Sequence, residues 1–270
     1  MALVPFPGPQ GSAVPAVPPE EDDESSGARM SFLDHLDELR RRIVNSCIAI
    51  ALGIAATFYW IDSIFNFILA PTRAALPPGV KLIYTQPGEA FSLYITIALI
   101  AGAVVASPFI MLQVWLFIAP GLYSNEKRLA IPFVLFTTLG FLAGAAFNHY
   151  ISFPYLMKFF ASFNTPDLAF MPKLEDVFGL YSKMLIGMGL VFQMPAVVFF
   201  MAKMKLITAR FLVSNFKYAL LIIFIAAAVI TPSGDMMTQT IFAAPMLGLY
   251  LLSIAIAWVF GPKRLGGAEA

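Results

Sequence analysis

Charge is the scarcest property of this sequence. Of its 270 residues only 12% are Asp, Glu, Lys or Arg, whereas 59% are hydrophobic, and the mean hydropathy is +0.80. Because soluble domains carry about 25% charged residues, this shortage excludes a water-soluble globular protein. A span of about 20 apolar residues crosses the roughly 30 Å hydrocarbon core, so the chain has room for around six spans. The sequence predicts an all-α, multi-pass membrane protein without a sizeable soluble domain.

Cysteine and histidine are also nearly absent, with one and two residues. A single cysteine, Cys47, excludes an intrachain disulfide and a cysteine-based metal cluster, and we expect it to pack as a small hydrophobic side chain. The sequence also lacks a phosphate-cradling loop and a nucleophile paired with a base, which disfavours a membrane enzyme. We therefore predict no catalytic residue, no cofactor and no metal site.

The first 30 residues differ from the rest in composition. They are rich in Pro and Gly and include an unbroken acidic run at 20–24. This pattern is typical of a disordered tail, and it lacks the basic and apolar regions of a signal peptide. We divide the chain into this tail (1–30), a six-span membrane domain (31–262) and a short second tail (263–270). Whether the folded part begins at Met30 is left open.

Six long apolar stretches follow the first tail. They are residues 43–61, 90–118, 129–150, 178–202, 217–231 and 239–260. The fifth is the shortest, because its fully apolar part, 218–230, is too short to cross the bilayer at 1.5 Å per residue. Either the helix continues back through 211–216 or the bilayer is thinner around it. The loops at 62–89 and 151–177 are long and proline-rich, which indicates an external cap.

A short amphipathic helix is expected to precede the first apolar stretch. Ser31 and Asp34 have the spacing of a helix-start motif, and Leu36, Leu39 and Ile43 recur at three- and four-residue spacing. These apolar residues form one stripe, and acidic and basic residues fall on the opposite face. We expect this segment to lie in the membrane interface as it enters the first span.

Basic residues are unevenly divided between the two sides of the predicted topology, and their bias sets orientation. One side holds Arg29, Arg40, Arg41, Arg42, Lys127, Arg128, Lys203, Lys205, Arg210, Lys217, Lys263 and Arg264; the other holds Arg73, Lys81, Lys158 and Lys173, with Lys183 nearer to it. The richer side also carries both termini. We therefore predict that both termini are cytoplasmic.

Within the apolar stretches the polar side chains that remain are few. Gln113, Gln193 and His149 are the exceptions. Gln193 precedes Pro195 by two residues, so its amide either bonds a backbone carbonyl that the proline frees or contacts a partner helix. His149 has no ligand-like neighbours and is interpreted as structural. A secondary transporter or ion channel, the alternative function, would be expected to carry ionisable groups at mid-membrane and discontinuous helices.

Two glutamates stand among basic residues on the predicted cytoplasmic side. Glu38 lies in Leu-Asp-Glu-Leu-Arg-Arg-Arg (36–42), and Glu126 lies in Tyr-Ser-Asn-Glu-Lys-Arg (123–128). A carboxylate matches the fork of a guanidinium, so two of them suggest a receptor surface for a cationic ligand. The alternative for Glu38 is a surface ion pair with Arg41 or Arg42 at i+3 or i+4.

Four motifs carry a family resemblance. They are Phe-Leu-Asp-His-Leu-Asp-Glu-Leu-Arg-Arg-Arg at 32–42, Gln-Val-Trp-Leu-Phe-Ile-Ala-Pro-Gly-Leu-Tyr at 113–123, Glu-Lys-Arg at 126–128 and Thr-Pro-Ser-Gly-Asp at 231–235. In this order they resemble TatC, the multi-spanning receptor subunit of the twin-arginine protein translocase. The resemblance implies a concave, glove-like bundle of six helices in the bacterial inner membrane, which binds signal peptides bearing paired arginines on folded cargo.

The resemblance also implies partners and residue roles. It implies a hetero-oligomer with single-span proteins of the TatA and TatB type, driven by the proton-motive force; no nucleic acid partner is expected. The implied signal-peptide-binding residues are Glu38, Glu126, Arg40, Lys127 and Arg128. Three further positions match the family: Pro71 its external-loop proline, Asp235 the acid of its last external turn, and Gln193 a buried Glu or Gln that engages partner helices.

Overall fold

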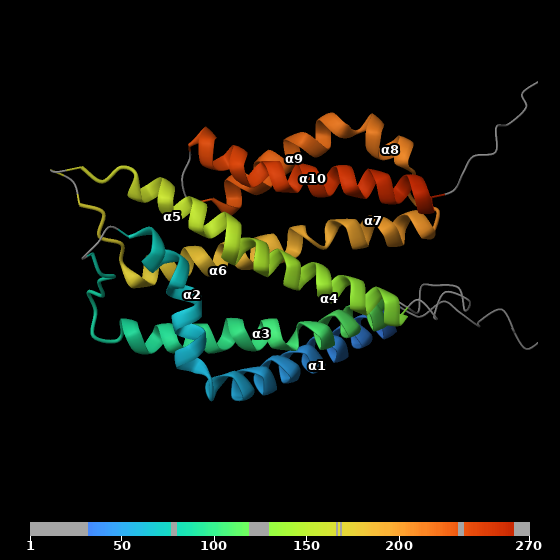
Figure 1. The fold of residues 1–270 in the computed structure, drawn as a ribbon. Coiled ribbons are helices and arrows are strands. Elements are labelled where there is room, and N and C mark those ends of the chain that lie inside the picture. The colour runs from blue at the N-terminus through green and yellow to red at the C-terminus, as the bar shows by residue number, and fades with distance from the viewer. Residues whose placement is uncertain are drawn as a thin grey trace, which may run out of the picture.

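The computed structural model describes residues 32–76, 80–118, 130–165, 167, 169–231 and 235–261. Helices dominate this part of the chain (Figure 1). Both predicted tails, the start motif at Ser31 and the predicted site residues Glu126, Lys127 and Arg128 lie outside the described residues.

Within the described part of the chain, five helical segments are long and apolar enough to cross a membrane. They are α1 (Phe32–Phe58), α3 (Glu89–Ile118), Ile131–Ala161, Leu174–Lys203 and α10 (Met236–Phe260). A sixth apolar helix, α9 (Phe216–Ile230), has 15 residues and is therefore about 22 Å long. Asn215 separates it from the short α8 (Ala209–Ser214), so the helix does not continue straight through 211–216. The six apolar elements predicted from the sequence are confirmed.

Two of these segments contain an irregular turn. The third consists of α4 (Ala130–Phe147), a wide π-helical turn (Asn148–Ser152) and α5 (Phe153–Ala161). The fourth consists of α6 (Leu174–Val191) and α7 (Met194–Lys203), with a break at Phe192 and Gln193. Pro195 explains the break, because it has no N–H to donate to the carbonyl of Val191.

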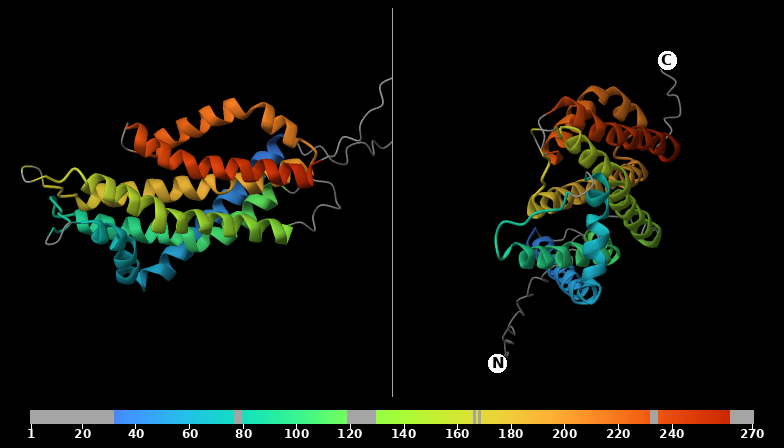
Figure 2. Two further views of the ribbon diagram at one scale, coloured as in Figure 1. Left: turned by 45° about the horizontal axis from the view of Figure 1, so that its top comes forward. Right: turned by 60° about the vertical axis from the view of Figure 1, so that its left-hand side comes forward.

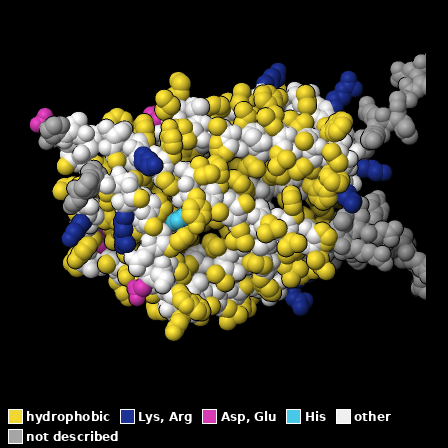
Figure 3. Space-filling model, in the orientation of Figure 1, with side chains coloured by type: hydrophobic (Ala, Val, Ile, Leu, Met, Phe, Trp, Pro, Cys, Tyr) yellow, Lys and Arg dark blue, Asp and Glu magenta, His cyan; other side chains and the backbone are white. Residues whose placement is uncertain are grey.

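The helices form a curved layer. Each packs mainly against the next in the order α1, α3, α4, α6 with α7, α10 and α9 (Figures 1 and 2). Most of the surface of each span is consequently exposed, and for α1 only 11% of the apolar window is buried. Hydrophobic side chains cover the middle of the visible face, and charged side chains lie mainly toward its two ends (Figure 3). This is the distribution expected of a protein surrounded by lipid.

Helix α1 is one continuous helix of 27 residues, so the predicted amphipathic segment runs directly into the first span. Its placement in the membrane interface stays a prediction. Leu36, Leu39 and Ile43 are exposed, at 43%, 36% and 53%, and Cys47 is exposed as well. The expectation that Cys47 packs internally is wrong, because α3 covers a different face of this helix.

Glycine allows α1 and α3 to cross with their backbones in contact. A Cβ on Gly53 would overlap the carbonyl oxygen of Gly102, and a Cβ on Gly102 would lie 2.6 Å from the backbone nitrogen of Ile54. Where α4 meets α6, a Cβ on Gly144 of α4 would likewise lie 2.6 Å from the carbonyl oxygen of Met188 in α6. Two neighbouring pairs in the layer are thus packed as closely as backbones allow.

A cap covers the end of the layer opposite the start of α1 (Figure 1). It contains α5 and α2 (Ile61–Ala75), which pack against each other, although the sequence predicted loops there. Pro71 lies inside α2 rather than in a loop. One face of α2 is buried, with Ile68, Leu69 and Thr72 turned inward. This amphipathic pattern is the reason that a proline-containing segment of 15 residues is helical.

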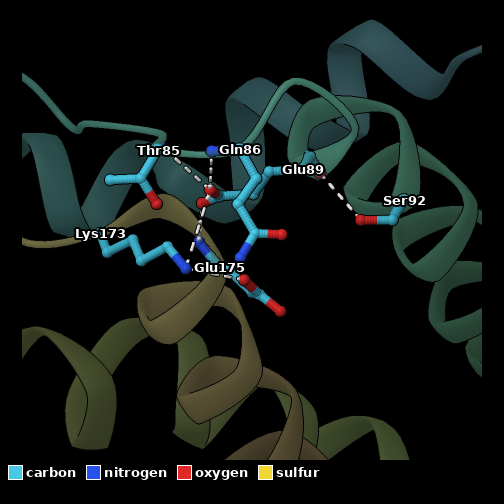
Figure 4. A network of polar contacts seen from close by, with 6 residues as sticks. All are labelled: Thr85, Gln86, Glu89, Ser92, Lys173 and Glu175. Atoms are coloured by element: carbon cyan, nitrogen blue, oxygen red, sulfur yellow. Dashed lines mark hydrogen bonds and ion pairs between the residues drawn. The ribbon is translucent and has the colours of Figure 1, made fainter.

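The Glu89 carboxylate joins the loop before α3 to the loop before α6. Glu89, at the start of α3, accepts hydrogen bonds from the backbone N–H groups of Thr85 (2.9 Å), Gln86 (3.3 Å) and Glu175 (3.2 Å), as Figure 4 shows. Lys173 lies 3.8 Å from it, and the Glu89 side chain is only 1% exposed. The hydrogen bond that Lys173 donates to Glu175 raises the pKa of the lysine.

A backbone contact reinforces this junction. Ile83 and Lys173 form an isolated parallel β-bridge. The N–H of Leu174 donates to the carbonyl of Ile83 at 2.8 Å, and the N–H of Ile83 donates to the carbonyl of Pro172 at 3.3 Å. The outer ends of α3 and α6 are therefore fixed to each other.

The helices enclose a hollow beside these close contacts. A hollow of about 430 Å³ lies among α1, α2, α3, α4 and α6, with Ile100 and Val104 of α3 in its wall. Toward the end opposite the cap, α3 is again held, because Trp115 packs against Phe133 of α4 and Phe200 of α7 with ring centroids 4.7 and 5.4 Å away. Helix α2 of the cap contributes Ile64, Phe67 and Ile68 to the lining of the hollow.

Candidate functional site

The candidate site lies where α1 begins and α3 ends, beside the aromatic cluster. Glu38 and Arg42 are one turn apart on α1 and form an ion pair of 2.9 Å. Arg42 Nη1 also donates to Gln113 Oε1 of α3 at 3.4 Å. The side chains of Glu38 and Arg42 are 14% and 23% exposed. Glu38 and Arg42 are thus turned toward α3, and the apolar stripe of α1 is exposed.

The hydrogen bonding of this pair is incomplete. Glu38 Oε2 and Arg42 Nε are both shielded from solvent and have no hydrogen-bond partner among the described residues. A carboxylate oxygen in this state is costly, because it has lost water without gaining a donor. One oxygen of Glu38 is therefore engaged by Arg42, and the other is available to a further donor.

An aromatic contact between the same two helices lies near the Glu38–Arg42 pair. His35 of α1 stacks on Phe117 of α3, with ring centroids 4.5 Å apart. Arg40 and Arg41 are exposed on α1. The Glu38 carboxylate therefore lies between α1 and α3, which are packed against each other by this ring contact. Arg40 and Arg41 add positive charge nearby on α1.

The predicted binding residues divide into two groups. Glu38 and Arg40 are described, and both lie on the first turns of α1. Glu126, Lys127 and Arg128 lie outside the described residues, so their convergence with Glu38 stays a prediction. Helical spacing offers both Arg41 and Arg42 as ion-pair partners for Glu38, and the geometry selects Arg42.

The position of Gln113 in the site was not predicted. The sequence singled it out as a polar exception in an uncharged stretch, but no spacing rule connects it to Arg42, which is 71 residues away. Its packing partner could be found only once α1 and α3 were placed together. Because of this contact, both α1 and α3 contribute residues to the site.

The three other predicted positions have structural contacts. Gln193 Nε2 donates to the carbonyl of Thr137 in α4 at 2.9 Å, whereas its Oε1 is buried without a partner among the described residues. That carbonyl belongs to another helix and is not the one freed by Pro195. Asp235 caps α10 by accepting from the N–H of Thr238 at 2.7 Å. Pro71 lies in α2, as described above.

His149 has the surroundings of a structural residue. Its Nδ1 lies 3.1 Å from the hydroxyl of Tyr181, and the ring of Phe67 stacks on it at 3.9 Å. Among the described residues there is no group of three or more His, Cys, Asp or Glu that could hold a metal ion. Glu38 with its free oxygen is thus the strongest candidate for ligand recognition in the described part of the chain.

Fold and site together define a class: an all-helical, multi-pass membrane protein with a partly satisfied carboxylate at one end of its helices. Residues 34–245 match the family model of the Sec-independent protein translocase protein TatC. This match covers more than half of the chain, and the chain therefore belongs to the TatC family.

Individual relatives agree with the family match. The chain is 42% identical to the Sec-independent protein translocase protein TatC of Koribacter versatilis over 238 residues, covering 87% of this chain and 88% of the relative. Identity to the protein of the same name from Aquifex aeolicus is 37% over 237 residues, with 87% and 98% covered. A crystal structure described as the twin arginine translocase receptor TatC in DDM superposes with a TM-score of 0.74 at 36% identity, covering 83% of this chain and 99% of that one. The fold predicted from the resemblance is confirmed.

Proposed function

We propose that this protein is the signal-peptide receptor of a twin-arginine translocase in a bacterial inner membrane. In this proposal both termini are cytoplasmic, and the two arginines of the signal peptide bind carboxylates at the cytoplasmic end of α1 and α3. Glu38 provides one carboxylate and Glu126 the other, with Arg40, Lys127 and Arg128 at the edge of the site. Family membership favours this function over a secondary transporter or ion channel.

The observation that carries the proposal is that Glu38 Oε2 is buried and has no hydrogen-bond partner among the described residues. An incoming guanidinium supplies several N–H donors in a planar fork, which fits a carboxylate oxygen that has lost water and lacks a donor. Hydrogen bonds to charged groups contribute about 1.5 to 3 kcal/mol. A lysine ammonium is a compact, strongly hydrated point charge, so it matches such a site less well.

Partner assembly is the second part of the proposal. Single-span proteins of the TatA and TatB type would pack on the exposed spans, and Gln193, a half-buried residue at the break between α6 and α7, would contact one of them. Interhelical hydrogen bonds in lipid contribute about 0.6 to 2 kcal/mol. Replacing Gln193 with Leu should weaken co-purification of the single-span partner and leave peptide binding unchanged; loss of folding would instead mean that its bond to Thr137 is its main role.

Photocrosslinking tests the receptor function directly. A synthetic twin-arginine signal peptide carries a photoreactive residue beside its arginine pair and is irradiated with the full-length protein in lipid nanodiscs. We expect Glu38→Lys and Glu126→Lys each to lower crosslinking roughly ten- to hundredfold, the loss that corresponds to a charged hydrogen bond. Replacing the arginine pair of the peptide with two lysines should have a similar effect.

A matched control separates the site from general charge effects. Asp37 is exposed and adjoins Glu38 on the same helix, so Asp37→Lys makes the same charge change without touching the site and should leave crosslinking nearly unchanged. Crosslinking that is indifferent to both glutamate substitutions would reject the receptor function at these residues.

A further inference from the structure

An aromatic pocket of about 320 Å³ lies at the end of the layer opposite the cap, where α4 begins and where α7 and α10 end (Figure 1). Its apolar lining consists of Pro132, Phe133, Phe136, Phe199, Ile256 and Phe260. Phe136 and Phe260 are 45% and 52% exposed, and the rings of Phe199 and Phe260 meet edge to face with centroids 4.9 Å apart. The pocket is therefore open at the surface of the spans, where lipid surrounds the protein.

The pocket lies close to the level at which the spans leave the hydrocarbon. Trp258 is 74% exposed and precedes Phe260, the last residue of α10, by two positions; tryptophan is enriched at the membrane–water interface. Lys203 is exposed and ends α7 four residues beyond Phe199, and residues at this spacing share a face of a helix. The pocket thus has a lysine one helical turn from its lining, on the side of the membrane surface.

Positive charge continues after α7. Lys205 and Arg210 are both exposed in the segment that follows. This segment lies beside the end of α10, because a Cβ on Gly261 would lie 3.9 Å from the carbonyl oxygen of Ile207. Residues 177–234 include five basic residues and no Asp or Glu, so no acid of this stretch neutralises them. A negatively charged group is the complement of such a surface.

We propose that the pocket binds one acyl chain of an anionic phospholipid, whose phosphate is held by Lys203 and the basic residues that follow it. An apolar lining offers water no hydrogen bonds, and an empty pocket leaves its rings without contacts on one side. Acyl chains are the apolar groups that the bilayer supplies, and basic pockets between transmembrane helices at the cytoplasmic side bind anionic head groups. In the proposed orientation the lipid belongs to the cytoplasmic leaflet. The lipid site is independent of the receptor function, because none of its residues is assigned to the signal peptide.

Lys205 occupies a backbone position that favours glycine. Its φ of 61° lies in the left-handed region. The N–H of Leu206 donates to the carbonyl of Met201 at 2.9 Å, which closes the helix end as in a Schellman motif. Glycine adopts this conformation without steric cost, whereas lysine is strained in it. The chain thus keeps a positive charge near the pocket at a position where an uncharged glycine is the more stable residue.

Native mass spectrometry tests the site with two lipids that share their acyl chains and differ in head-group charge. Full-length protein in detergent is titrated with dioleoylphosphatidylglycerol, which is anionic, or with dioleoylphosphatidylcholine, which has no net charge. We expect the anionic lipid to bind more tightly. Lys203→Gln should lower its affinity about fivefold, the effect of one basic residue near an anionic surface, and should leave the affinity for phosphatidylcholine unchanged.

Lys81→Gln is the matched control, because Lys81 is exposed in the cap at the other end of the layer, and both affinities should keep their wild-type values. Equal affinity of the wild type for the two lipids, or equal losses in Lys203→Gln and Lys81→Gln, would overturn the site. Glycerophosphoglycerol, the anionic head group without acyl chains, should not displace the bound lipid. Displacement would mean that phosphate binds without the pocket and would reject the acyl-chain site.

Filling the pocket tests its lining. Ile256→Trp should lower the affinity for both lipids, whereas Val259→Trp adds the same ring to α10 at an exposed position outside the lining and should not. Unchanged binding in Ile256→Trp would also reject the acyl-chain site. Should that variant fail to fold, Lys205→Gly removes a charge and relieves strain, so its unfolding temperature should rise while its affinity for phosphatidylglycerol falls several-fold. A rise in temperature with unchanged affinity would overturn the assignment of these basic residues to the lipid phosphate.

Discussion

Two glutamates of this protein are shielded from solvent, and their hydrogen bonding is very different. Glu89 accepts from three backbone N–H groups and lies near Lys173, so both of its oxygens are satisfied. Glu38 has one partner, Arg42, and one oxygen without a donor among the described residues. A satisfied carboxylate stabilises the fold, whereas an unsatisfied one favours a ligand. The first fastens the cap, and the second is the candidate receptor group.

Replacing Glu89 with Gln should destabilise the protein. An amide has one acceptor oxygen where the carboxylate has two, and its NH₂ group would face backbone donors. Leaving buried groups without partners costs about 1 to 3 kcal/mol. We expect a lower thermal unfolding temperature of the purified protein in detergent.

Glu175→Gln is the matched control. The Glu175 side chain is 61% exposed and pairs with Lys173 at the surface, and exposed ion pairs contribute about 0 to 1 kcal/mol. Its unfolding temperature should stay close to that of the wild type. Equal shifts in the two variants would mean that the buried hydrogen bonds of Glu89 do not stabilise the cap.

At this scale the sequence predicts neighbours along a helix but not across the layer. Glu38 and Arg42 are four residues apart, so helical spacing alone suggests that they meet. Glu89 bonds the N–H of Glu175, 86 residues away, and no local pattern connects the two. Backbone donors carry no side-chain signature, so the role of Glu89 had to come from the structure.

At the scale of elements, apolar runs located all six predicted apolar helices. The helices of the cap were missed. α2 and α5 have 15 and 9 residues, and both include a proline, so the sequence pattern favours a loop. Their helicity comes from packing against each other and against the layer, which a single sequence does not display.

The contact between α1 and α3 should be sensitive to one methyl group. Gly53→Ala and Gly102→Ala would each place a Cβ against backbone atoms of the opposite helix. Backbone cannot rotate away as a side chain can, so the helices must separate, and overpacking of this kind costs about 1 to 3 kcal/mol. We expect lower unfolding temperatures for both variants.

Gly248→Ala provides the comparison. Gly248 lies within α10, and a Cβ there would meet no atom within 4 Å. Alanine is the better helix former by about 1 kcal/mol in water. This variant should be as stable as the wild type or more so; destabilisation similar to that of Gly53→Ala would show that loss of glycine itself, and not contact between helices, causes the effect.

At the scale of the whole molecule, the arrangement in a layer places charged residues at both ends. The cap at one end carries Arg73 and Lys81, and the opposite end carries the three arginines of α1 with Arg210. Basic residues are retained on the cytoplasmic side. The orientation proposed from this bias follows from the sequence, and labelling of the protein in its membrane can test it.

A cysteine-free background allows that test, because Cys47 is the one cysteine of the chain. In Cys47→Ala, a second change, Lys81→Cys or Arg210→Cys, adds a single thiol at an exposed position. A membrane-impermeant maleimide applied to cells with a permeabilised outer membrane should label the thiol at 81 and should reach the thiol at 210 only after the inner membrane is opened. The reverse pattern would invert the proposed topology.

Helix α3 forms part of the wall of the hollow and is held near both of its ends. α3, with 30 residues, is about 45 Å long; Glu89 fixes its outer end to the loop before α6, and Trp115 fixes it to α4 and α7. A helix held in this way cannot rotate as a rigid body about one of its ends. It can only bend, and it bends most easily at Pro108, which lacks one helical hydrogen bond. Any widening of the hollow that moves α3 is therefore a bend at Pro108, five residues before Gln113.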